Sequence, residues 1–120
     1  MFVYYNRNPN NEITGDCVIR AISTALGIEY YKVLNMLYRN SNYFNCDMIV
    51  KDCYKKIFED YGLIEYTPKT KKTVKEVAED FKDDILIIRI NQHLTCSIYN
   101  CIMDIWDCSN EIVDTFWVVN

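Results

Sequence analysis

Hydrophobic side chains recur every three or four positions through the first two-thirds of the chain, a period typical of amphipathic helices. We expect helices at residues 17–26, 29–39, 47–61 and 73–81. Local residues support the ends of two of them. Gly27 is a natural left-handed terminator for the first helix, and Asp16 has the chemistry of its N-cap. The Thr-Val-Lys-Glu stretch at 73–76 matches a capping box at the start of the last helix.

The hydrophobic pattern changes in the last third of the chain. Residues 85–90 (ILIIRI) form a dense β-branched run that predicts a central strand, and residues 94–99 alternate between apolar and polar side chains. The Asn100-Cys101 dipeptide is the expected hairpin turn, although it lacks the usual glycine, and residues 102–106 are the returning strand. Further strands are expected at residues 2–5 and 111–119, and residues 63–66 are expected to form a short strand or an extended link. Helices followed by antiparallel strands predict an α+β fold, and residues 1–120 are expected to form a single domain.

Composition narrows the classes of protein to which this fold could belong. Half of the 120 residues are hydrophobic and a quarter are charged, as in ordinary globular domains. The formal net charge of −4 argues against a general binder of nucleic acid or of anionic membranes. No apolar run reaches the roughly 18 residues of a membrane span, and the first residues lack the pattern of a secretory signal. We therefore expect a cytoplasmic protein with reduced thiols.

Cysteine is abundant, with six residues in the chain. No pair has the Cys-x-x-Cys spacing of a zinc site, and the chain has a single histidine, so we expect no metal and no other cofactor. A disulfide framework is not expected in a reducing compartment. Most of the cysteines should therefore pack as small buried hydrophobic residues. They are Cys17, Cys46, Cys53, Cys96, Cys101 and Cys108.

One cysteine stands where a thiol is easily activated. Cys17 follows Gly-Asp and opens the first expected helix. The first turn of a helix presents unpaired N–H groups and the positive end of the helix dipole, and both favour a thiolate. The backbone N–H of Cys17 could also bind the oxyanion of a reaction intermediate. A nucleophilic role is therefore one hypothesis, and a packed first-turn cysteine is the other.

The single histidine, His93, precedes the alternating strand, and two aspartates follow on the returning strand. A histidine that acts as a base needs an acid to orient its second ring nitrogen. The expected turn places Leu94 opposite Asp107, which brings Asp107 nearest to His93. Strict alternation instead places Asp104 on the face of His93, and a bulge would reverse that parity. We expect Asp107 to orient His93, with Asp104 as the alternative.

This order of chemistry resembles that of papain-like cysteine peptidases, in which an early helix carries the cysteine and a late antiparallel sheet carries the histidine and its partner. More specifically, GDCVIRA, HLT and DIWDC resemble motifs of a mostly uncharacterised group of small phage and low-GC bacterial proteins. That group has GDCxxRA, then a GHLT-like segment, then DTWD, and the likeness covers residues 8–117. Gln92 stands where the group has glycine. The resemblance implies a papain-like fold with Cys17 as nucleophile, His93 as general base and acid, and Asp107 as the orienting residue.

The resemblance also implies roles for three further residues. In the wider superfamily a glutamine several residues before the cysteine completes the oxyanion hole, and the matching spacing falls on Asn11. Trp106 matches a tryptophan that shields the histidine–acid pair. Arg20, one turn into the helix, is expected to have a structural role and to pair with Asp16 or with Asp107.

The leading hypothesis is therefore a papain-like thiol hydrolase that acts on a peptide or protein amide through a cysteine thioester. Peptidase, isopeptidase, deamidase and acyltransferase chemistry all use this machinery, and the sequence does not separate them. The alternative is a catalytically silent binding or inhibitor module of the same fold that acts on a host factor. A nucleic-acid or membrane partner is not expected, and the oligomeric state is not predicted.

Overall fold

Four helices account for the periodic first part of the chain in the computed structural model, which describes residues 1–119. Within these residues the helices are α1 (Cys17–Leu26), α2 (Tyr30–Phe44), α3 (Lys51–Asp60) and α4 (Val74–Asp80). The bounds of α1 agree with the prediction, and Gly27 ends it in the left-handed conformation. The predicted capping box is confirmed, because Thr73 and Glu76 satisfy one another's backbone N–H groups at the start of α4.

Two helix boundaries differ from the prediction. The second helix continues to Phe44, beyond the expected end at residue 39, and Asn45 stops it in the left-handed conformation. The third helix begins at Lys51 rather than at residue 47. Among the described residues, no helix combines the length and apolar character needed to cross a membrane.

The described strands form one mixed sheet of six. They are β1 (Phe2–Tyr4), β2 (Glu65–Tyr66), β3 (Ile85–Ile90), β4 (His93–Ile98), β5 (Cys101–Asp104) and β6 (Val113–Val119). Their order across the sheet is β1-β5-β4-β3-β6-β2. Only β1, which pairs with β5, runs parallel to its neighbour. The expected α+β architecture is therefore confirmed, with β3 at its predicted bounds.

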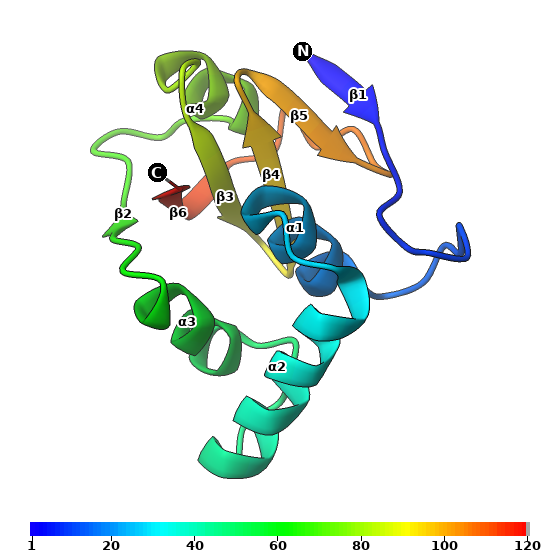
Figure 1. Ribbon diagram of the computed structural model, residues 1–120. Helices are drawn as coiled ribbons and strands as arrows, with labels where there is room; N and C mark the ends of the chain where they lie inside the picture. The colour runs from blue at the N-terminus through cyan, green and yellow to red at the C-terminus, as the bar shows by residue number, and fades with distance from the viewer. Residues whose placement is uncertain (120) are drawn as a thin grey trace.

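The sheet is buried on both faces, which explains the continuous apolar run of β3. Ile87 and Trp117 pack in one core with residues of α1, α2 and α3. Leu86 and Ile88 point the other way and pack with residues of α4 in a second core. In Figure 1, α1 lies in front of β3 and β4, and α2 and α3 follow from it. This arrangement holds the start of α1 near the start of β4.

The turn between β4 and β5 corrects a prediction that matters for the site. Ser97 pairs with Ile102 and Ile98 with Cys101, so the turn is Tyr99-Asn100 rather than Asn100-Cys101. Both turn residues have positive φ, 48° and 67°, as a type I′ turn requires. A turn one residue earlier shifts the pairing by two positions, which leaves every side chain on its predicted face but moves the residues of β5 along β4.

Candidate functional site

Cys17 and His93 line one cavity of about 560 Å³, to which the starts of α1, α3 and β4 contribute. Cys17 is the first residue of α1, and His93 is the first residue of β4, after the turn that leaves β3. Both side chains are half-buried. The structure therefore brings together the two residues that the sequence analysis proposed as nucleophile and base. The other residues that line the cavity are Gly15, Val18, Ile49, Val50, Lys51, Tyr54, Arg89, Asn91, Gln92 and Leu94.

The acid that contacts His93 is Asp104, not Asp107. His93 Nε2 lies 2.7 Å from Asp104 Oδ2, and the Asp104 side chain is only 2% exposed. Asp107 is exposed, and its carboxylate accepts a hydrogen bond from the backbone N–H of Ser109. The earlier turn is the reason, because the shift of two positions brings Asp104 toward the start of β4. The preference for Asp107 is wrong, and the alternative drawn from strand alternation has the right geometry.

The pKa shifts of Cys17 and His93 both favour the charged forms, a thiolate and an imidazolium. Burial raises the pKa of the Cys17 thiol, but its hydrogen bond with His93 and the backbone N–H of Leu94 outweigh burial, so the pKa lies below its ordinary value. Burial lowers the pKa of His93, but hydrogen bonds with Asp104 and Cys17 outweigh it and raise the pKa to about 9. Because Nε2 of His93 faces Asp104, Nδ1 is the ring nitrogen left for the thiol.

Trp106 lies beside His93, as expected. Its ring packs edge-to-face on the His93 imidazole, with 5.0 Å between the ring centroids. Trp106 is 45% exposed, so its ring lies at the protein surface beside His93. Trp106 lies two residues beyond the end of β5, and the pairing of β4 with β5 brings it beside the start of β4.

Asn11 does not reach the cavity. It is exposed, its φ is 55°, and its backbone N–H donates to the carbonyl oxygen of Asn8 at 3.0 Å. The residue therefore serves the turn of the loop, and the expectation of an oxyanion donor at this position is wrong. Gln92 does line the cavity and has a φ of 55°, a conformation that glycine adopts without strain.

The start of α1 lacks the side-chain cap that the sequence suggested. Asp16 holds the N-cap position, but its carboxylate accepts no hydrogen bond from the first turn. The Asp16 side chain is buried and accepts hydrogen bonds from Arg20 Nε at 2.6 Å and from the Tyr30 hydroxyl at 2.7 Å. The first N–H groups of a helix have no partner within it, so those of Cys17 and Val18 are left without a side-chain acceptor beside the cavity.

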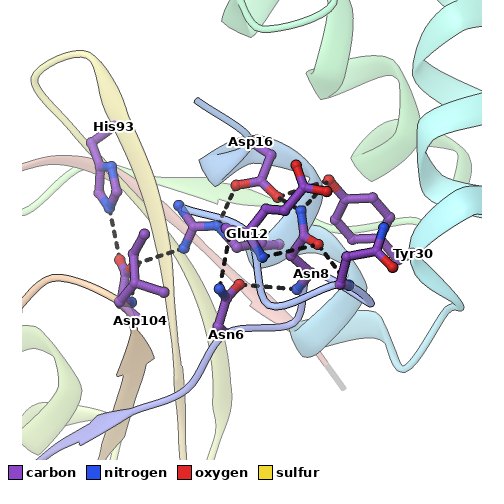
Figure 2. A network of polar contacts seen from close by, with 10 residues as sticks. Asn6, Asn8, Glu12, Asp16, Tyr30, His93 and Asp104 are labelled. Atoms are coloured by element: carbon purple, nitrogen blue, oxygen red, sulfur yellow. Dashed lines mark hydrogen bonds and ion pairs between the residues drawn. The ribbon is translucent and has the colours of Figure 1, made fainter. Parts of the chain in front are cut away.

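Arg20 links this cluster to the histidine–acid pair. It bonds Asp16 and also donates from Nη1 to Asp104 Oδ1 at 2.9 Å, whereas Asp107 was one of its two expected partners. The hydrogen bonds therefore run without a break from Tyr30 through Asp16, Arg20 and Asp104 to His93 (Figure 2). The i,i+4 spacing of Asp16 and Arg20 was visible in the sequence.

Two members of this cluster gave no signal in the sequence. Tyr30 belongs to the apolar stripe of α2, and nothing local marks it as a hydrogen-bond donor to Asp16. Asn8 lies in a polar loop, yet its side chain is buried and donates to Asp16 Oδ2 at 3.1 Å. Both contacts depend on how the loop and α2 pack against α1.

One group of side chains could be considered for a metal. Donor atoms of His93, Asp104 and Cys108 lie within 4.8 Å of one another. His93 Nε2 and Asp104 already bond each other, and burial raises the pKa of the Cys108 thiol to about 12. A thiol binds a metal as a thiolate, so this group fits a hydrogen-bonded cluster better than a metal centre. All six cysteines of the described residues are free thiols.

The fold and the site define an α+β domain with a cysteine, a histidine and an aspartate in series at a cavity. Compared with family models, with curated proteins and with solved structures, the chain has no significant match in any of the three comparisons.

Proposed function

We propose that this chain is a papain-like thiol hydrolase that cleaves a peptide or protein amide by acyl transfer to Cys17. The observation that carries the proposal is the series Cys17–His93–Asp104 at the cavity. A thiol at a helix start, an imidazole in contact with it and a buried carboxylate behind the imidazole are the parts that nucleophilic catalysis by cysteine requires.

The first half of the reaction forms a thioester. The Cys17 thiolate attacks the carbonyl carbon of the amide, and the electron pair of the C=O bond moves to the oxygen. In this proposal the N–H groups of Cys17 and Val18, which no side chain caps, stabilise the oxyanion. When the oxyanion collapses, the C–N bond breaks, and the His93 imidazolium gives its proton to the leaving amine.

The second half restores the enzyme. Neutral His93 takes a proton from water as the water oxygen attacks the thioester carbon. The second tetrahedral intermediate collapses with cleavage of the C–S bond, which releases a carboxylic acid and the Cys17 thiolate. Asp104 holds Nε2 of His93 through both halves, so that the other ring nitrogen stays directed at the thiol and the substrate.

Alkylation with iodoacetamide tests the proposal, because every cysteine can be followed by mass spectrometry. At pH 6 an ordinary thiol is only about 0.3% ionised. We expect Cys17 to react at least about tenfold faster than the half-buried Cys46 and Cys101, and we expect His93→Ala to abolish this advantage. Lys75→Ala, on the exposed side of α4, is the matched control and should leave the rates unchanged.

A second measurement tests acyl transfer itself. The p-nitrophenyl ester of acetic acid is an activated acyl donor, and a burst of p-nitrophenolate followed by slower turnover would report a thioester on Cys17. Cys17→Ala should remove the burst. A Cys17 that reacts no faster than Cys101, together with the absence of a burst, would overturn the proposal and favour the silent binding module.

A further inference from the structure

The two oxygens of the Asp104 carboxylate serve two different cations. Oδ2 faces His93 Nε2 at 2.7 Å, and Oδ1 accepts a hydrogen bond from Arg20 Nη1 at 2.9 Å and another from the backbone N–H of Ile105 at 2.7 Å. Asp104 and Arg20 are both almost fully buried. This carboxylate is therefore fixed in position, and its charge is divided between an imidazole and a guanidinium.

Arg20 is also bound by a second carboxylate, that of Asp16. Its Nε donates to Asp16 Oδ1 at 2.6 Å, so one guanidinium bridges two buried carboxylates. The other oxygen of Asp16 accepts hydrogen bonds from the Tyr30 hydroxyl and from the Asn8 amide. Figure 2 shows this network of contacts, which extends from Asp16 to His93. Every charged member thus has a partner, as burial of ionised groups requires.

We propose that Arg20 and Asp16 are positioning residues for the reaction proposed above: Arg20 fixes Asp104 and limits how strongly its carboxylate holds the proton of His93, and Asp16 moderates the charge of Arg20. This inference rests on the proposed function for its catalytic meaning. The reason is electrostatic, because the positive charge of Arg20 repels an imidazolium on the same carboxylate and so offsets part of the attraction of Asp104 for it. His93 must release its proton to the leaving amine, and Arg20 makes that release easier.

The surroundings of each group leave few other charges to consider. Asp104 is faced by Arg20 from α1, by His93 from β4 and by the Cys108 thiol from the segment after β5. His93 is faced by Cys17 from α1 and by the uncharged ring of Trp106. Lys51 and Arg89 line the same cavity, but they are paired with Glu65 and Asp114 respectively.

Asp16 is faced by Arg20, by Tyr30 from α2 and by Asn8 from the loop before α1. Burial and the contact with Asp16 raise the pKa of the Tyr30 phenol, so Tyr30 stays a neutral donor. Within this hydrogen-bonded network, the charges that can shift the titration midpoint of His93 are therefore those of Asp104, Arg20, Asp16 and Cys17.

The single histidine makes the test direct, because its imidazole C–H signals in an NMR titration need no assignment. Two hydrogen bonds and one carboxylate separate the guanidinium from the imidazole, so the two cations lie within about 8 Å of each other. At that distance, a charge shifts a pKa by on the order of one pH unit at an effective dielectric constant of about 20.

We expect Arg20→Met and Asp16→Asn to shift the titration midpoint of His93 in opposite directions. Arg20→Met removes the competing cation and should raise the midpoint of His93 by on the order of one pH unit. Asp16→Asn leaves Arg20 uncompensated and should lower the midpoint. Arg20→Lys keeps the charge and should bring the midpoint back toward that of the parent protein. Arg39→Met, on the exposed surface of α2, is the control and should not move it.

Shifts of the same sign in the two charge variants, or no shift in either, would overturn the inference and leave the network a purely structural one. Should Arg20→Met fail to fold, the near-isosteric Asp16→Asn still provides a test, because an unchanged or raised midpoint would show that the charges of this network do not reach His93 as proposed. The titration needs no substrate. Opposite shifts with an unreactive Cys17 would therefore refute the hydrolase while keeping the coupling, and a reactive Cys17 without these shifts would refute the coupling alone.

Discussion

The contact between Asp104 and His93 can be tested by removing the charge and keeping the shape. Asp104→Asn preserves the volume of the side chain but replaces the carboxylate with an amide. The neutral amide no longer stabilises the imidazolium, and it leaves Arg20 with one buried anionic partner in place of two. Loss of one partner from a buried ion pair typically costs about 3–5 kcal/mol.

Part of that cost depends on pH, and the pKa of His93 sets the window. Its pKa is raised from 6.5 to about 9 in the folded protein, so its charge stabilises the fold fully below pH 6.5 and ceases to do so as the pH rises through 9. At about 1.4 kcal/mol per unit, this contribution is about 3 kcal/mol, and Asp104 supplies the larger part of it. The free energy of unfolding of the Asp104 variant should therefore fall furthest below that of the parent protein near pH 6, and the difference should become smaller above pH 9.

Urea denaturation at pH 6 and at pH 9.5 measures this difference, with Asp107→Asn as the matched control. Asp107 is exposed and bonds only Ser109 in its own loop, so its variant should unfold like the parent protein at both pH values. The pKa of Asp104 is itself lowered, since contacts with His93 and Arg20 outweigh the effect of burial. The parent should therefore lose stability in acid as the pH falls below 3.8. A loss in the Asp104 variant that is equal at the two pH values, or a larger loss in the Asp107 variant, would refute the reasoning.

Three further substitutions probe the frame that supports the site. Tyr30→Phe removes the hydroxyl that donates to buried Asp16 and should cost about 1–3 kcal/mol in urea denaturation; an unchanged midpoint would contradict the contact. Thr73→Ala removes the capping box of α4 and should cost about 1 kcal/mol, whereas Thr70→Ala, outside any helix, should cost nothing measurable in thermal unfolding. Tyr99→Asn should stabilise the protein by up to about 1 kcal/mol and so raise its melting temperature, because asparagine adopts the left-handed conformation more readily than tyrosine. A lower melting temperature would refute the assignment of this turn.

The hydrophobic pattern was sufficient where a segment packs against a core along most of its length. The predicted bounds of α1 and β3 agree with the structure because most of their apolar side chains are buried. The hydrophobic pattern was misleading at the start of α3. Ile49 and Val50 were counted as part of the helical stripe, but they precede the helix and lie largely exposed beside the cavity. Apolar side chains at a site do not follow the period of a core.

The choice between the two aspartates could not be made from the sequence for a geometric reason. The position of a hairpin turn is read from residues that accept positive φ, and Asn-Gly is the strongest such signal. Here Tyr99 takes the first turn position, although aromatic residues seldom adopt this conformation, so the dipeptide Asn100-Cys101 looked at least as suitable. The error of one residue in the turn left the facing of the strands correct and moved the expected acid from Asp104 to Asp107.

Asp16 shows how a long-range contact can override a local rule within the same motif. An aspartate before a helix normally caps it, and the gain from a cap is about 1 kcal/mol. A guanidinium buried in the core requires anionic partners, and an unpaired one would cost several times more. Arg20 lies one turn along the same helix, so Asp16 can turn inward to meet it, and Asp104 from the sheet completes the pairing. The same turn of Asp16 leaves the first N–H groups of α1 without a side-chain cap, so the burial of one arginine accounts for both the uncapped helix start and the fixed position of the carboxylate beside His93.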